Sequence, residues 1–285
     1  MKKVLITAID SFTGIHLSAY LKQNGYTVVG TTSKTCNITN KDDIKQVLKD
    51  TKPTHIVHLA AISFTAHGNN EDFYKVNTIG TTNLLEAIVE LDLKLSKLIL
   101  ASSATVYGNQ GIEVLDESLC PIPVNHYGAS KYAMETLAKN YFSKLPIIIT
   151  RPFNYTGVGQ ADHFLIPKII KHYKEKKETI ELGNLDVSRE FNDISFLCEA
   201  YSRLLKLEES SQIVNISTNK AIKLLDVIDT MNTIANYNIK VEVNPAFVRK
   251  DEIKSLSGSS TKLFNLIGPV PQKDLYTMLK EIYKS

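Results

Sequence analysis

The sequence predicts a doubly wound α/β fold, with a parallel sheet and a smaller C-terminal lobe. Short apolar runs alternate with segments of helical periodicity through residues 1–152. These runs are nearly unbroken, which is typical of strands that are buried on both faces of a parallel sheet. After residue 152 the alternation gives way to loop-like and irregular segments, which indicates a second structural unit.

Each element of the first half follows from this alternation. The expected strands cover residues 3–8, 26–32, 55–61, 97–103 and 146–152, and the expected helices cover 16–23, 41–50, 77–91 and about 129–142. This order is that of a Rossmann-like domain. We expect residues 1–155, with about 186–212, to form this domain, and about 156–185 and 213–285 to form the smaller lobe. The default ligand site is a cleft between the two.

Composition narrows the class of protein. The 285 residues are 43% hydrophobic and 22% charged, and the net charge of +3 is scattered. The most basic run, residues 168–178, has helical spacing and predicts a solvated helix face rather than a nucleic-acid site. Three cysteines form no CxxC pair, and no apolar stretch approaches the length of a membrane span. We therefore expect a cytoplasmic protein without a membrane segment.

A Tyr-x-x-x-Lys pair is the strongest local signal for chemistry. Tyr127 and Lys131 lie in YGASK at the start of a predicted helix, so both side chains reach one face. A nearby ammonium lowers the pKa of a phenol. Alone, the pair is equally well explained as a surface contact. Ser103, at the carboxyl end of a predicted strand where ligands bind, favours a site instead.

These segments resemble the extended short-chain dehydrogenase/reductase family, whose members act mostly on nucleotide sugars. The matching stretches are TAIDSFTG, HLAA, SSATVYG, YGASK and RPFN, and they run over nearly the whole chain. Residues 151–160, 181–194 and 244–253 look most like reductases of GDP-4-keto-6-deoxy-mannose. The resemblance implies that Tyr127 protonates the forming alkoxide, that Ser103 orients the oxygen, and that Lys131 binds the nicotinamide ribose and lowers the pKa of Tyr127.

The resemblance also implies a cofactor site. Its expected residues lie on the phosphate turn, at the ends of the first strands and around the nicotinamide: Thr7, Asp10, Ser11, Phe12, Thr13, Thr32, Ser33, Lys34, Asn37, Ile38, Leu59, Ala60, Ala61, Asn77, Tyr127, Lys131, Pro152 and Phe153. No acid follows the second strand, where a carboxylate would repel a 2′-phosphate. We expect NADPH to be preferred over NADH.

The phosphate turn departs from the pattern of the family. Ala8 and Ser11 stand where two of the three glycines are usual, and only Gly14 is kept. The Ser11 side chain would occupy space near the phosphates, although its hydroxyl could also donate a bond to them. A decayed enzyme would have no chemical reason to keep Ser103, Tyr127 and Lys131. We expect weakened cofactor binding with catalysis retained.

The resemblance assigns a GDP-linked 4-keto-6-deoxy sugar as substrate. Its expected contacts are Ser103, Thr105, Asn154, Arg189, Arg249 and Glu252. Thr105 stands where similar dehydratases have Glu and fucose-synthase-type epimerases have Cys, so elimination and C3/C5 epimerisation are not expected. Alternatively, Arg189 pairs with Glu190, and Arg249 with Asp251, at the surface.

Two other functions and several details stay open. A C4 epimerase of the UDP-galactose kind also carries SSATVYG, and a noncatalytic NADP sensor would share the fold. The product is expected to serve the synthesis of surface polysaccharide, as lipopolysaccharide or capsule. The sequence leaves open whether it is a hexose or a heptose, its C4 configuration and its nucleotide base. His55 and His58 lie three apart on a strand, so no metal site is expected. Analogy predicts a homodimer through helices at about 71–93 and 129–143.

Overall fold

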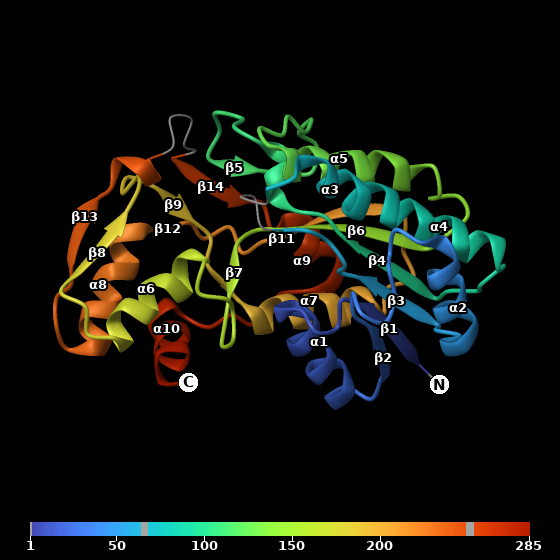
Figure 1. The fold of residues 1–285 in the computed structure, drawn as a ribbon, viewed down its shortest axis with the longest axis horizontal. Coiled ribbons are helices and arrows are strands. Elements are labelled where there is room, and N and C mark those ends of the chain that lie inside the picture. The colour runs from blue at the N-terminus through green and yellow to red at the C-terminus, as the bar shows by residue number, and fades with distance from the viewer. Residues whose placement is uncertain (1, 64–67, 249–253) are drawn as a thin grey trace.

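A six-stranded parallel sheet forms the core of the larger lobe in a computed structural model, which describes residues 2–63, 68–248 and 254–285 (Figure 1). The strand order is β11-β6-β4-β3-β1-β2. The strands are β1 (Lys3–Thr7), β2 (Thr27–Thr31), β3 (His55–His58), β4 (Lys97–Ala101), β6 (Ile147–Pro152) and β11 (Gln212–Ile216). The chain leaves β1 for β2 and then crosses back to β3, so the topological switch point, where ligands bind in such sheets, lies between β1 and β3.

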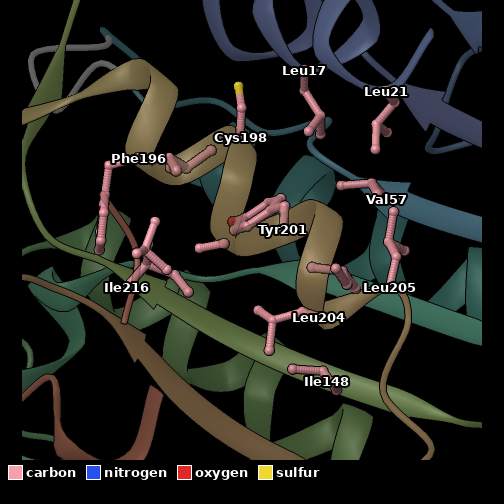
Figure 2. Packing of buried hydrophobic residues seen from close by; sticks show 14 of the residues in the cluster. Leu17, Leu21, Val57, Ile148, Phe196, Cys198, Tyr201, Leu204, Leu205 and Ile216 are labelled. Carbon is pink, nitrogen blue, oxygen red and sulfur yellow. The ribbon is translucent and has the colours of Figure 1, made fainter. Parts of the chain in front are cut away.

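Helices cover both faces of this sheet, which confirms the predicted doubly wound fold. On one face lie α1 (Phe12–Gln23), α7 (Ile194–Leu204) and α9 (Thr261–Ile267), and on the other lie α2 (Lys41–Thr51), α4 (Thr81–Glu90) and α5 (His126–Lys139). Successive strand residues alternate between the two cores: Ile6 and Val57 face α1 and α7, whereas Leu5 faces α2 and α4. Figure 2 shows Tyr201 and Leu204 of α7 packed against the sheet.

Side-chain caps set where the first helices begin. The Ser11 hydroxyl accepts a hydrogen bond from the Gly14 amide (3.1 Å), so α1 begins four residues earlier than predicted. Asn125 caps α5 in the same way. The helix expected over 77–91 is longer, because α3 (Asn70–Phe73) and a π-helical segment (Tyr74–Gly80) precede α4. Polar caps of this kind satisfy the amides of a first turn that have no partner within the helix.

A second, smaller set of elements follows β6. Helices α6 (Leu165–Lys174), α8 (Leu224–Ala235) and α10 (Leu275–Lys284) pack with the parallel pair β8 (Thr179–Leu182) and β13 (Lys240–Val243). A mixed sheet of order β12-β9-β14-β5 contains β5 (Val114–Leu115), β9 (Ser188–Arg189), β12 (Ile222–Lys223) and β14 (Ser255–Gly258). The pair β7 (Tyr155–Thr156) and β10 (Asn192–Asp193) lies between this set and α1 (Figure 1). Two 3-10 turns cover Ala104–Tyr107 and Pro245–Phe247.

Two details differ from the sequence-based division. Strand β11 and helix α9 follow residue 212, where the smaller lobe was expected to resume, but they pack with the large sheet. Strand β3 ends at His58, so Leu59, Ala60 and Ala61 form a loop at the edge of the sheet. In the part of the chain that the structure describes, no helix has the length and apolar character needed to cross a bilayer.

Candidate active site

Ser103, Tyr127 and Lys131 come together at the carboxyl edge of the large sheet. Ser103 follows β4, while Tyr127 and Lys131 lie in the first two turns of α5. The Ser103 side chain acts on the Tyr127 phenol and lowers its pKa. The Lys131 ammonium is buried and donates to the carbonyl of Ala101 (2.7 Å). The structure thus brings together the three residues that the sequence predicted to react.

Thr105 fixes the direction of the Ser103 hydroxyl. The Ser103 oxygen accepts hydrogen bonds from the Thr105 hydroxyl (2.9 Å) and from the Thr105 amide (3.2 Å). Because a hydroxyl oxygen has two lone pairs, its single proton is left to be donated. The Ser103 proton is therefore available for the phenol oxygen of Tyr127 or for an oxygen of a bound substrate. Thr105, expected only as a substrate contact, also positions Ser103.

Burial sets the protonation states of the pair on α5. It raises the pKa of Tyr127 to about 12, and the nearby polar side chain of Ser103 opposes this shift. Burial also lowers the pKa of Lys131 to about 8, and the nearby carboxylate of Glu135 opposes that shift. The sequence suggested that Lys131 would lower the pKa of Tyr127, but burial is the largest influence and raises that pKa instead. At neutral pH Tyr127 is a phenol and Lys131 is mostly charged.

A buried ion pair that sequence reasoning missed holds α5 against the sheet. The carboxylate of Glu135 receives two hydrogen bonds from Arg151 on β6 (2.9 and 2.6 Å) and one from Ser102 (2.5 Å). Glu135 is 0% exposed and Arg151 is 2% exposed. Glu135 lies four residues after Lys131, on the same face of α5, and this spacing was the available signal. The pair fixes the helix that carries Tyr127 and Lys131.

A chain of hydrogen bonds through His58 holds the loop after β3. The Thr7 hydroxyl accepts from the amides of Leu59 and Ala60 (3.0 Å each), so it donates to Nδ1 of His58 (2.9 Å). The opposite ring nitrogen of His58 then donates to Thr81 (3.0 Å). Burial lowers the pKa of His58 to about 3, so the ring is neutral. Thr7 and His58 therefore fix the backbone of the predicted cofactor-binding loop through hydrogen bonds within the protein.

Asn77 supports the neighbouring stretch of the same loop. Its side chain bonds both backbone groups of Ile62 (2.8 and 3.1 Å) and donates to the Ser130 hydroxyl (3.0 Å). The residue is fully buried. The side-chain amide of Asn77, predicted to bind the cofactor, is thus occupied by bonds within the protein.

The phosphate turn keeps its shape with a single glycine. Ala8 has φ = 53°, a left-handed conformation in which glycine is normally favoured. A Cβ at Gly14 would lie 2.4 Å from the carbonyl oxygen of Ala8, so α1 can approach the strand only with glycine there. The Ser11 hydroxyl caps α1, and Asp10 is exposed beside it. A helix N-terminus presented in this way fits the diphosphate of a dinucleotide.

The segment after β2 is where the adenosine ribose of the cofactor is expected to bind. Ser33 and Lys34 are exposed, and Thr32 is held by bonds with Thr35 (2.9 Å between the Thr32 amide and the Thr35 hydroxyl). The Asn37 amide donates to Asp43 (3.1 Å). Ile38 is partly buried, and its side chain lies where a Cβ on Gly80 would clash.

The residues expected around the nicotinamide and the substrate have different surroundings. Pro152 is half-buried, whereas the Phe153 ring is buried against Tyr107 and Gly258. Asn154 is exposed. Arg189 on β9 donates to the carbonyls of Ser188 (2.8 Å) and Lys254 (3.3 Å). Arg249, Asp251 and Glu252 lie outside the described residues.

Glu190 does not take the surface position that pairing with Arg189 would require. Its side chain is 0% exposed, and its two oxygens accept bonds from neutral donors. These include the Asn192 side chain (2.9 Å), the Ser217 hydroxyl (2.5 Å), the Thr218 amide (2.9 Å) and the Gly258 amide (2.7 Å). The carboxylate joins β9, β10, β14 and the segment after β11.

Known proteins share both the sequence and the fold. Residues 4–217 match the model of the NAD dependent epimerase/dehydratase family. The chain is 37% identical to the GDP-6-deoxy-D-talose 4-dehydrogenase of Aggregatibacter actinomycetemcomitans over 286 residues, which cover 99% of this chain and 97% of the relative. It is 27% identical to the GDP-6-deoxy-D-mannose reductase of Pseudomonas aeruginosa, with 99% and 96% covered. The solved structure of RMD from Pseudomonas aeruginosa complexed with NADPH has a TM-score of 0.91 at 26% identity, covering 100% of this chain and 97% of that one.

Proposed function

The chain belongs to the NAD dependent epimerase/dehydratase family, and from this premise we propose that it reduces the C4 keto group of a GDP-linked 4-keto-6-deoxy sugar with NADPH. The observation that carries the proposal is the meeting of Ser103, Tyr127 and Lys131 at the carboxyl edge of the large sheet. The GDP-6-deoxy sugars in the names of two relatives support the substrate class. NADPH, when bound, supplies the hydride that a ketone needs.

Tyr127 supplies the proton of the reaction. Adding a hydride to C4 and a proton to the keto oxygen converts C=O to CH–OH, so the proton donor must be a neutral acid. The raised pKa of Tyr127, about 12, keeps it a phenol at neutral pH. Ser103 donates toward the phenol oxygen, so it stabilises the phenolate that remains after proton transfer. The same raised pKa opposes the reverse oxidation, which needs Tyr127 as a phenolate base.

Thr105 supports simple reduction over the other reactions of similar enzymes. Its hydroxyl is an ordinary alcohol that donates to Ser103, and an alcohol does not remove a proton from carbon. Dehydration and C3/C5 epimerisation both require such a base. Reduction at C4 requires only the proton from Tyr127.

The preference for NADPH is supported by the charge at the end of β2. The described segment from Thr32 to Cys36 contains no acid and presents the exposed cation of Lys34. A 2′-phosphate would be attracted there, and the first turn of α1 would meet the diphosphate. Lys131 would bind the nicotinamide ribose. The RMD structure at 26% identity was solved with NADPH, which agrees with this choice.

Assembly through α4 and α5 is part of the proposal. The stretch from the π-helical segment through α5 exposes Ile79 (51%), Val89 (39%) and Leu137 (37%). Exposed apolar side chains on neighbouring helices favour a contact between copies of the chain. Light scattering after size-exclusion chromatography tests it: a dimer is expected, and Leu137→Lys should weaken it.

The first experiment measures NADPH oxidation at 340 nm with freshly made GDP-4-keto-6-deoxy-mannose. Wild-type protein should turn over, whereas Tyr127→Phe should lose at least about 100-fold in kcat, the usual loss when a general acid is removed. NMR of the product then reads the C4 configuration, which distinguishes GDP-6-deoxy-talose from GDP-6-deoxy-mannose. The matched control is Tyr173→Phe, because Tyr173 lies in the core of the smaller lobe.

Two results would replace the proposal. Interconversion of UDP-sugars at C4 with tightly held NAD and no net NADPH use would identify the epimerase alternative. Cofactor binding without turnover of either substrate, and without any effect of Tyr127→Phe, would identify a noncatalytic sensor.

A further inference from the structure

Tyr155 on β7 reaches across to the first turn of α1. Its hydroxyl lies 2.8 Å from the Thr13 hydroxyl, and its ring stacks on Phe12 with centroids 6.2 Å apart and an interplanar angle of 14°. Thr13 is buried and Tyr155 is half-buried. A Cβ on Gly157 would meet Ile194 at 2.6 Å and the Phe12 ring at 3.4 Å. A segment about 140 residues downstream therefore clamps two consecutive residues of the turn.

The turn has reason to depend on such a clamp. Ala8 holds a left-handed conformation at a cost that glycine would avoid. Ser11 contributes one capping bond to Gly14. Neither residue fixes the side chains of the first turn of α1. Tyr155 does so, through a hydrogen bond with Thr13 and a ring stacked on Phe12.

We propose that Tyr155 is a positioning residue for the cofactor, which holds the first turn of α1, through Thr13 and Phe12, in the arrangement that receives the diphosphate. The inference rests on the proposed function in one respect, that the ligand of this turn is NADPH. Tyr155 is not a catalytic residue, because its contacts are with the turn and not with the reacting atoms.

The strand that carries Tyr155 links the first turn of α1 to other parts of the candidate site. Strand β7 pairs in parallel with β10, with Tyr155 opposite Asn192, and Asn154 immediately precedes it. The Tyr155 phenol also contributes to the raised pKa of Tyr127. Tyr155 thus connects the turn of α1 to the strand that leads away from the active site.

A double-mutant cycle tests the proposal by direct binding of NADPH, without sugar. Tyr155→Phe keeps the stacked ring and removes the hydroxyl, and Thr13→Val removes the other half of the bond. Each should raise the NADPH Kd about 3- to 10-fold, the range for a lost hydrogen bond. The double variant should be no weaker than either single variant, because all three lack the same bond. Thr13→Ser keeps a hydroxyl and should retain the wild-type Kd.

A control separates positioning from general stability. Tyr173→Phe also removes a buried tyrosine hydroxyl, which donates to Asn232 (2.7 Å), but in the smaller lobe. It should lower the thermal unfolding midpoint and leave the NADPH Kd unchanged. Tyr155→Phe should change the Kd even when compared well below its own unfolding midpoint.

Three results would overturn the inference. An unchanged Kd in Tyr155→Phe would show that the hydroxyl does not position the turn. Additive losses in the double variant would show that Thr13 and Tyr155 act separately. If wild-type protein bound neither NADPH nor NADH, the proposed function would fail as well, whereas wild-type binding with unaffected variants would overturn only the role of Tyr155.

Discussion

Replacing Ala8 by glycine should stabilise the protein, although an alanine-to-glycine replacement at most positions is destabilising. Ala8 has φ = 53°, and this left-handed conformation costs an L-residue about 1–2 kcal/mol that glycine does not pay. Glycine also makes the unfolded chain more flexible, which costs about 0.4–1 kcal/mol. The difference is a net gain of about 1 kcal/mol, or about 2–4 °C in Tm for a chain of this size.

Urea unfolding followed by circular dichroism measures this change. The matched control is Ala19→Gly, at an exposed position inside α1, which should lose about 1 kcal/mol because its backbone is helical. Ser11→Gly removes a cap and should lose only a few tenths of a kcal/mol. If Ala8→Gly lowers the unfolding free energy as Ala19→Gly does, the argument from backbone strain at Ala8 is refuted.

The same variants test the weakened phosphate turn. Ala8→Gly combined with Ser11→Gly restores the glycines usual in the family, and it should lower the NADPH Kd. An unchanged or raised Kd would mean that the two side chains do not hinder the cofactor.

Three further predictions concern the site. The kcat/KM for NADPH should fall as pH rises through about 8, because the lowered pKa of Lys131 leaves its amine neutral above that pH. An active Lys131→Arg variant should not show this fall, because arginine stays charged. If the variant shows the same fall, another group is responsible for it. Glu135→Gln should lower the free energy of unfolding by about 3–5 kcal/mol, because it leaves the buried Arg151 without a carboxylate partner. The control is Glu90→Gln, which removes an exposed ion pair with Lys41. An equal loss in this control would contradict the prediction. Lys34→Asp should shift the NADPH:NADH ratio of kcat/KM at least about tenfold toward NADH, and an unchanged ratio would remove Lys34 from cofactor choice.

The central sheet was predictable because its strands are buried on both faces. Residues 97–101 and 147–150 are almost entirely apolar, and that pattern needs no knowledge of partners. The end of β3 was not predictable. Leu59 and Ala60 read as strand, but their amides bond the Thr7 hydroxyl, which lies 52 and 53 residues earlier.

The proximity of the candidate catalytic residues was predictable from spacing and motif, but the side chains that support them were not. Tyr127 and Lys131 share a helix, so four residues of separation suffice to place them together. Glu135 and Arg151 come from a helix and a strand, and only the tertiary fold shows that they pair. The same holds for Tyr155 and Thr13, whose contact joins two ends of the site.

The buried carboxylate of Glu190 has a consequence for the order of synthesis and folding. All strands of the large sheet have been made once β11 has been synthesised. The Gly258 amide that donates to Glu190, however, lies 68 residues after Glu190 in the sequence. Until that segment leaves the ribosome, the acid lacks one of its donors and desolvating it is costly. A nascent chain that ends before β14 should therefore carry the six strands of the large sheet without α9 on one face and beside an unfinished smaller lobe, and the two lobes should pack together only when β14 and α9 have been made.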